Sequence, residues 1–392
     1  MNKMRKASVG LISLLSIGLS ATLARPQTRN EALLSTENAY NPIPSPDGKS
    51  IAYVRTGWGK SGGSGGFGRS NLVSQVVVID GAGSSAAMMP LADMFLSGWT
   101  LNSASIVCYR DGAYSLVSTL GEHLSNGRLS AATNVIGSER VSYLERSGRV
   151  VWSQQNGFHT LLETPSGVLA QRDGWIGDLI AQSPDGRYLA ITGAWSSSHL
   201  WVYDIIQSNW SDLGEASIHP DRDWDYIKPS WSPWFVDSSR LAYFTHDNSV
   251  LTISSPDGKR RTDIQINGKG GVAAPSPDGR SLAYVTFEPR PREQRPDLQF
   301  WGGTCIWVIS LIGKPEPRPV TSQSLDETYD LRWLGDHALV FDRFADVPLY
   351  MHARIWKVGV DLDGRQQQTG GEICDRTSSP NRVERRPLTT NH

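Results

Sequence analysis

A four-residue turn sequence, Ser-Pro-Asp-Gly, constrains the fold of this chain more than any other feature. It occurs four times, at residues 45–48, 183–186, 255–258 and 276–279. Proline presets φ at the second position of a type I turn, aspartate suits the third, and glycine is favoured at the fourth. An apolar run typical of a buried strand follows three of the copies, so the chain repeats a turn and a strand.

The apolar run recurs in looser form between these copies. The seven runs are residues 51–54, 106–109, 141–144, 189–192, 241–244, 282–285 and 339–342. They recur about every 48 residues, the size of a four-stranded propeller blade. We predict an all-β fold, a seven-bladed β-propeller of four-stranded blades, which closes without free sheet edges. Six blades are the alternative, because the unit around Val141 is short and weakly marked.

This repeat resembles that of the TolB-like β-propeller family, in which Ser-Pro-Asp-Gly precedes an apolar strand ending in Ala-Tyr or Ala-Phe. It is also similar to the propeller domain of the dipeptidyl peptidase IV and prolyl oligopeptidase families. The resemblance covers residues 38–368 and implies a propeller fold, and for the TolB-like family contacts with envelope proteins. The segment after the last unit is too short for the hydrolase domain of those peptidases, so we expect no such domain.

The N-terminus has the pattern of a bacterial secretory signal peptide. Residues 2–6 carry three basic side chains, residues 7–24 are apolar or small, and Ala24 ends a small-residue cleavage motif. An uncleaved anchor is the alternative, although glycines and serines weaken a membrane-spanning helix. We expect a periplasmic or secreted protein with no transmembrane segment after cleavage. The expected organisation is a signal peptide (1–24), a linker (25–37), the propeller (38–368) and a disordered polar tail (369–392).

Charge and cysteine content narrow the classes of partner and cofactor. The formal net charge is −1, so nothing indicates a nucleic-acid partner. The three cysteines, Cys108, Cys305 and Cys374, lack the spacing of a zinc site, and an odd number leaves one without an intramolecular partner. We expect Cys108 to be a buried apolar residue and disulfides to contribute little to the fold.

Catalytic motifs are weak in this sequence. Two Gly-x-Ser-x-Gly matches, at 59–63 and 62–66, lie in one Gly/Ser-rich segment without the strand–turn–helix context of a nucleophile elbow. The eight histidines form no close metal pair. We therefore predict no catalytic residues, no metal ligands and no cofactor. The chain also resembles oligogalacturonate lyase in size and repeat type, so a metal-dependent polysaccharide lyase using the central funnel is the alternative.

Topology predicts a binding site at one rim of the ring. In a four-stranded blade, the connection between the second and third strands lies opposite the Ser-Pro-Asp-Gly turns. The long insertions there, 57–71, 287–304 and 342–354, belong to units one, six and seven, which are neighbours in a closed ring. Arginine and aromatic side chains, which are enriched at binding hot spots, occur in these insertions and in two further rim segments. They are Trp58, Phe67, Arg69, Arg290, Arg292, Arg295, Trp301, Arg343, Tyr350, His352 and Arg354, with Trp195 and Trp224.

Together these features favour a non-enzymatic protein-interaction module of the bacterial envelope. The expected partner is an envelope protein or an extended polymer held by the rim side chains. Besides the lyase, a sensor that binds glycans or cell-wall fragments without turnover is an alternative. The remaining alternative is that the rim residues are solvent-exposed loop side chains without a binding role.

Overall fold

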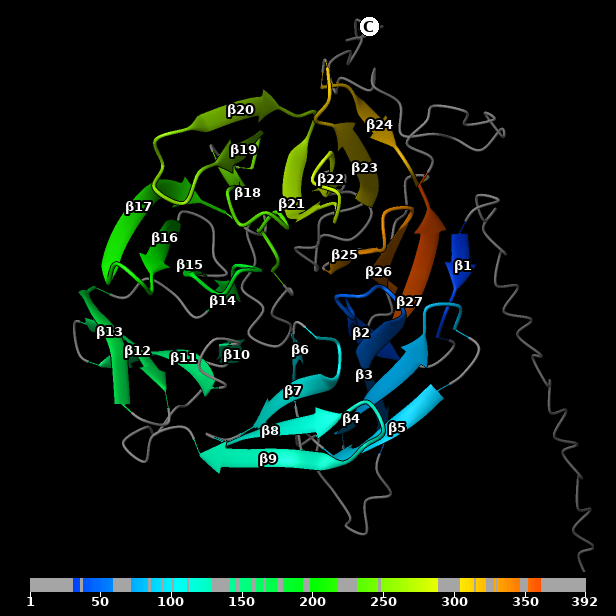
Figure 1. Ribbon diagram of the computed structural model, residues 1–392. Helices are drawn as coiled ribbons and strands as arrows, with labels where there is room; N and C mark the ends of the chain where they lie inside the picture. Colours follow the sequence, from blue (N-terminus) through cyan, green and yellow to red (C-terminus); the bar gives the residue numbers. More distant parts are fainter. Residues whose placement is uncertain are drawn as a thin grey trace, which may run out of the picture.

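The chain forms seven antiparallel sheets arranged in a ring around a central axis (Figure 1). We number these sheets one to seven in the chain order of the segments that lie nearest the axis. The all-β propeller fold is the one that the repeat predicts. The computed structural model describes residues 31–35, 38–58, 72–83, 86–92, 95–100, 102–110, 113–128, 141–144, 149–156, 159–164, 167–174, 179–192, 198–217, 231–245, 248–287, 304–313, 315–321, 328, 330–345 and 352–360.

Consecutive strands pair with one another in sheets one to six, whereas sheet seven also contains the N-terminal strand, which pairs with the last described strand. Sheets one to three are β2 (Ala39–Pro44), β3 (Ser50–Trp58), β4 (Leu72–Asp80) and β5 (Ala86–Ala92); β6 (Phe95–Trp99), β7 (Ser105–Arg110), β8 (Ala113–Ser118) and β9 (His123–Arg128); and β10 (Val141–Leu144), β11 (Arg149–Asn156), β12 (His159–Thr164) and β13 (Gly167–Asp173). Sheets four to six are β14 (Leu179–Gln182), β15 (Tyr188–Thr192), β16 (Ser198–Asp204) and β17 (Asn209–Ala216); β18 (Leu241–Thr245), β19 (Val250–Ser254) and β20 (Arg261–Gln265); and β21 (Lys269–Pro275), β22 (Ser281–Phe287), β23 (Thr304–Ser310) and β24 (Pro317–Pro319). Sheet seven is β25 (Leu331–Leu334), β26 (Ala338–Ala345), β27 (His352–Gly359) and β1 (Glu31–Leu33).

The predicted set of seven four-stranded blades is not what the structure has. Six sheets are four-stranded blades, the number that the sequence analysis held as its alternative, and sheet five has three strands. In sheet five the innermost position is taken by residues 231–235. This segment makes only an isolated bridge from Trp234 to Leu241, together with the hydrogen bond from the Ala242 N–H to the Pro233 carbonyl oxygen. Pro233 has no N–H to donate, so a regular ladder cannot form there.

The four Ser-Pro-Asp-Gly turns have the same pattern of hydrogen bonds. In each turn the serine Oγ donates to the aspartate Oδ1 at 2.5–2.6 Å, and the glycine N–H donates to the serine carbonyl oxygen at 2.8–3.0 Å. The N–H five residues after the serine donates back to the serine Oγ at 2.8–3.0 Å. The turn glycines have φ between 68° and 73°, a conformation that favours glycine.

These turns all lie on one face of the ring. Three of them join the first two strands of sheets one, four and six, as predicted, whereas 255–258 joins β19 to β20 at the outside of sheet five. Because neighbouring strands are antiparallel, the turns after the first and third strands of a blade are at the same end. We call this end the turn face and the opposite end the rim face.

The N-terminal strand completes the last sheet. β1 pairs with β27 over three residues, as the outermost strand of sheet seven. Arg343 Nη1 donates to Glu31 Oε2 at 2.7 Å, and both side chains are buried. Sheet seven is also held to sheet one, because Lys357 Nζ donates to the Gly81 carbonyl oxygen at 2.8 Å and the Ala353 N–H donates to Asn38 Oδ1 at 2.8 Å.

Apolar side chains fill the spaces between neighbouring sheets. Phe244 packs with Tyr284 between sheets five and six, and Phe287 lies in the cluster shared by sheets six and seven. Each such side chain contributes about 1.5–3 kcal/mol when it is fully buried. Gly270 and Gly271 of β21 leave room for two of these rings, since a Cβ would overlap Phe244 or Phe287. No helix in the described part of the chain is long and apolar enough to cross a membrane.

Candidate functional site

Most of the predicted rim residues lie outside the described residues. These are Phe67, Arg69, Arg290, Arg292, Arg295, Trp301, Tyr350, Trp195 and Trp224. Trp58 ends β3 and His352 begins β27, so their backbones are at the rim face, but their side chains are not described. The predicted role of all these residues therefore stays a prediction.

Arg343 is not a loop residue, contrary to the prediction. The strand β26 continues to Ala345, so Arg343 lies inside the sheet and is bonded to Glu31. Its guanidinium carbon is 5.0 Å from the ring centroid of Phe341 and 5.3 Å from that of Trp356. These contacts place Arg343 in the closure of the ring. Arg354 is the partner of Arg343 in the β26–β27 register, and its side chain is exposed.

The described strands that lead into the three insertions end on one side of the rim face. β3, β22 and β26 are the second strands of sheets one, six and seven, and all three run away from the turn face. Sheets six, seven and one are neighbours in the ring (Figure 1). The strand ends before the connections 59–71, 288–303 and 346–351 therefore lie in the same part of the rim face. The third one is shorter than predicted, because β26 and β27 extend into it.

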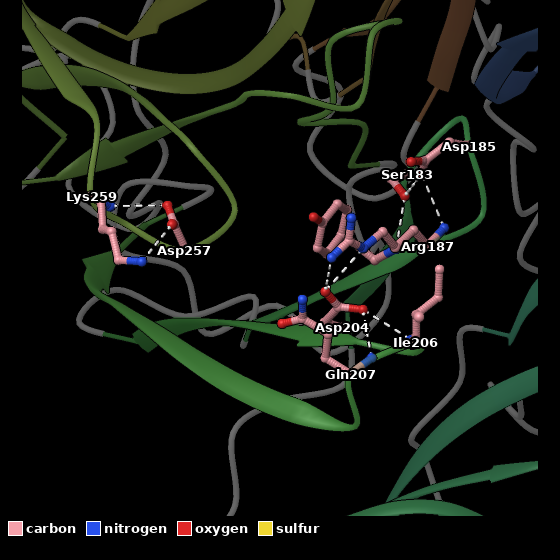
Figure 2. A network of polar contacts seen from close by, with 9 residues as sticks. Ser183, Asp185, Arg187, Asp204, Ile206, Gln207, Asp257 and Lys259 are labelled. Atoms are coloured by element: carbon pink, nitrogen blue, oxygen red, sulfur yellow. Dashed lines mark hydrogen bonds and ion pairs between the residues drawn. The ribbon is translucent and has the colours of Figure 1, made fainter.

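A second candidate site lies on the turn face, where sheets four and five meet. Arg187 donates from Nε and Nη2 to Asp204 Oδ2, at 3.0 and 2.6 Å (Figure 2). Asp204 Oδ1 accepts the N–H groups of Ile206 and Gln207 at 2.9 and 3.1 Å. Burial raises the pKa of Asp204, but the hydrogen bonds from Arg187, Gln207 and Ile206 outweigh it, so the pKa lies below its ordinary value. Asp204 therefore links Arg187, the residue after the 183–186 turn, to the turn between β16 and β17.

An aromatic stack adjoins this ion pair. The Arg187 guanidinium carbon lies 4.8 Å from the Tyr188 ring centroid, within the range of a cation–π contact. The rings of Tyr188 and Trp234 are stacked, with centroids 5.8 Å apart and an interplanar angle of 19°. Trp234 is buried, and its Nε1 donates to the carbonyl oxygen of Ala181 at 2.8 Å. Arg187, Tyr188 and Trp234 thus form a continuous stack across two sheets.

The tryptophan at the base of this stack has counterparts at two other junctions. Trp99 Nε1 donates to the Ile43 carbonyl oxygen at 2.7 Å, and Trp333 Nε1 to that of Ala274 at 2.8 Å. In each case the first strand of one sheet is bonded to the first strand of the preceding sheet. In sheet five Trp234 makes this contact. Trp231 is a buried core residue.

The structure describes two of the three cysteines, Cys108 and Cys305, together with possible metal ligands of other types. Among the residues that the structure describes, no group of three His, Cys, Asp or Glu side chains could hold a metal ion. Cys108 is free and buried, as predicted, and burial raises its pKa to about 12. Cys305 is disulfide-bonded, which was not expected.

Comparison with known proteins identifies the fold. A scan against protein-family models finds no match, and no curated protein matches the sequence. Among solved structures, an oligogalacturonate lyase in complex with manganese is similar over 86% of this chain and 95% of its own, with a TM-score of 0.55 and 10% identity. An uncomplexed acylaminoacyl peptidase of Pyrococcus horikoshii is similar over 83% of this chain and 53% of its own, with a TM-score of 0.51 and 11% identity.

A third structure is itself a propeller domain. The β-propeller domain of Cps50 (Swd1) from Myceliophteria thermophila is similar over 84% of this chain and 99% of its own, with a TM-score of 0.52 and 11% identity. Proteins with very different activities thus share this architecture, and a fold by itself does not imply a function. At these identities the similarity establishes that the chain is a β-propeller.

Proposed function

We propose that this chain is an exported propeller that acts as a non-enzymatic protein-interaction module in the bacterial envelope, in the manner of TolB-like proteins. The observation that carries the proposal is that β3, β22 and β26, the strands that lead into the connections 59–71, 288–303 and 346–351, end at the rim face of three neighbouring sheets. The partner is an envelope protein or an extended polymer.

Two physical arguments support this role. A ring closed by β1 and by the buried Glu31–Arg343 pair is a rigid scaffold, and binding residues are commonly placed on loops that such a scaffold positions. The connections also carry the residue types that dominate binding energy in interfaces, arginine and tryptophan. Export is proposed from the signal-peptide pattern of residues 1–24.

Site-specific photocrosslinking in a bacterial host tests the proposal. A photoreactive residue replaces Arg292 in the rim connection of sheet six, and in a matched control it replaces Lys259, an exposed cation on the turn face. We expect a discrete crosslinked product from position 292 that is absent from position 259. Equal products from both positions, or none from position 292, would argue against binding at the rim.

A polysaccharide lyase is the second candidate function. It is favoured by the similarity to the oligogalacturonate lyase, which covers nearly the whole of both chains. Incubation of the purified protein with oligogalacturonate and manganese tests this candidate, since lyase cleavage leaves an unsaturated product that absorbs ultraviolet light. Product formation that depends on the added metal would favour the enzyme, whereas glycan binding without product would favour the sensor.

A further inference from the structure

The outermost strands of the seven sheets differ in how they terminate the sheet. An edge strand can accept a strand of another chain, and proteins restrict such edges with bulges, prolines or very short strands. In four of the outermost strands, additional residues interrupt the register with the third strand of the sheet. These four are β5, β9, β13 and β17. A bulge bends each of these edges away from regular pairing.

Of the remaining outermost strands, two are short and one is regular. β1 pairs over three residues, and β24 has three residues, of which Pro317 and Pro319 have no N–H to donate. β20, the outermost strand of sheet five, pairs with β19 over five residues in unbroken register and contains no proline or glycine. Among the described outermost strands, β20 is therefore the one with a long and regular edge.

Alternate residues of β20 direct their backbone groups away from the sheet. The Ile266 N–H donates to the Ser249 carbonyl oxygen at 3.1 Å, and the Ser255 N–H donates to the Arg260 carbonyl oxygen at 2.8 Å. Hydrogen-bonded and non-hydrogen-bonded pairs alternate in an antiparallel ladder, so the even-numbered residues of β20 face β19. The strand lies on the outside of the ring (Figure 1). The residues whose N–H and C=O groups point outwards are Arg261, Asp263 and Gln265.

Two of these residues carry opposite charges on the same side of the strand. Arg261 Nε donates to Asp263 Oδ1 at 2.8 Å, and Thr252 Oγ1 donates to the same oxygen at 2.7 Å. The side chains of Arg261 and Asp263 are 37% and 47% exposed. An ion pair with this exposure contributes little to stability within the chain. Both charged groups are accessible to a second chain that approaches the edge.

We propose that β20 pairs with β20 of a second copy of this chain, antiparallel about a two-fold axis at Thr262. Arg261 of each copy then lies opposite Asp263 of the other copy. Each of these pairs exchanges backbone hydrogen bonds, because both residues have outward N–H and C=O groups, and opposite charges that face each other across strands are stabilising. The ladder covers three residues, as the one between β1 and β27 does.

The charges select both this register and this occupant. A two-fold axis at Asp263 would place two carboxylates opposite each other, and an axis at Arg261 would do the same with two guanidinium groups, which is unfavourable. A contact between identical surfaces must be complementary to itself, and the sequence Arg-Thr-Asp of residues 261–263 meets this condition about its central residue. The contact lies on the circumference of sheet five, so it does not depend on the proposed function of the rim face.

Sedimentation velocity of the purified chain over a range of concentrations tests this assignment. We expect a monomer–dimer equilibrium, which Arg261→Asp or Asp263→Arg alone weakens about tenfold because two facing pairs change from attraction to repulsion. An equimolar mixture of these two variants should dimerise again, since each aspartate of one then faces an arginine of the other. Arg318→Asp, on the proline-containing β24, is the control and should dimerise like the natural chain. A monomer at every concentration, a dimer that both variants retain, or a monomeric mixture of folded variants would overturn the proposal.

Cysteine pairing gives a second test that keeps the natural charges and serves if a charge variant does not fold. Thr262 is exposed, and at the two-fold axis it faces Thr262 of the second copy as a non-hydrogen-bonded pair. The Cα atoms of such a pair are about 4.5 Å apart, within the range for a disulfide. Thr262→Cys should therefore give a covalent dimer on a non-reducing gel after mild oxidation. Gln265→Cys, exposed on the same strand but outside the ladder, should not; equal dimer from both variants, or none from Thr262→Cys, would contradict the pairing.

Discussion

Trp333 Nε1 donates a hydrogen bond to the backbone carbonyl oxygen of Ala274, which lies 59 residues earlier in the sequence, at 2.8 Å. The bond is buried, and it joins the first strands of sheets seven and six. We predict that Trp333→Phe lowers the free energy of unfolding by about 1–3 kcal/mol, because a buried carbonyl loses its donor while most of the ring packing remains. Urea unfolding measures this change. Trp210→Phe is the control, since the indole N–H of Trp210 makes no hydrogen bond within the described residues. An equal loss of stability in both variants would contradict the account.

Gly270 of β21 is expected to tolerate no side chain. A Cβ at this position would overlap the ring of Phe244, which is buried between sheets five and six. Gly270→Ala should therefore destabilise the chain by about 1–3 kcal/mol, the usual cost of overpacking. Thermal unfolding checks this, with Gly98→Ala as a control at a strand position where a Cβ has no neighbour within 4 Å. Equal melting temperatures for the two variants would show that the core yields at Gly270.

The Glu31–Arg343 pair makes the closure of the ring sensitive to the loss of one charge. Both side chains are buried, with 3% and 9% of their surface exposed. Glu31→Ala should destabilise the chain by about 3–5 kcal/mol, because it leaves Arg343 buried without its partner. Adding Arg343→Met should recover much of this loss, since the uncompensated charge is then gone. Denaturant unfolding of the single and double variants distinguishes this closure role from a surface role, for which Glu31→Ala would change little.

The turn aspartates predict a stability loss at acid pH. The hydrogen bond from Ser255, with that of the Lys259 N–H, lowers the pKa of Asp257 from 3.8 to about 2, and the equivalent contact from Ser45 lowers that of Asp47. A carboxyl group whose pKa is depressed by folding stabilises the fold above its unfolded pKa. That contribution is lost as the pH falls from about 4 towards 2.

Unfolding curves recorded between pH 5 and pH 2 measure this dependence. Asp257→Asn cannot change charge at this position, so its stability should fall less steeply with decreasing pH than that of the natural chain. Identical slopes for the two proteins would mean that Asp257 has a normal pKa in the folded state.

The disulfide of Cys305 leads to a prediction about the C-terminal segment. Cys108 is free, and the chain has three cysteines. By elimination we predict a bond between Cys305 and Cys374 within one chain. Peptide mapping without reductant should find these two residues in one linked fragment from the monomer. Cys305 in a fragment linked to a second chain would contradict this pairing.

Local signals predicted most of the fold. The Ser-Pro-Asp-Gly turns and the apolar strands after them depend on neighbouring residues, so the repeat and the all-β ring could be read from the sequence. The inner segment of sheet five could not, because Trp231 and Trp234 have the same apolar character and only packing selects Trp234. The run 141–144 forms the first strand of sheet three, whereas the runs of sheets one, two, four, six and seven lie in their second strands.

The candidate site was less predictable because it depends on contacts between distant residues. Arg343 looked like a loop residue, since nothing near it in the sequence shows that Glu31, 312 residues away, is its partner. The stack of Tyr188 on Trp234 also joins two sheets. A signal for it does exist in the sequence, because Tyr188 stands where two other copies of the repeat have serine.

The measurement that tests the central claim most directly is affinity capture from envelope extract with the mature chain and a rim variant. The rim variant has Arg290, Arg292, Arg295 and Trp301 changed to alanine, and a control variant has Lys49, Lys259 and Arg280 changed to alanine on the turn face. Proteins that are retained are quantified by mass spectrometry, after circular dichroism has confirmed that each variant is folded. We predict a specific partner that is held by the natural chain and by the control but lost from the rim variant. Equal capture by all three proteins, or no specific capture, would contradict the rim-face interaction module.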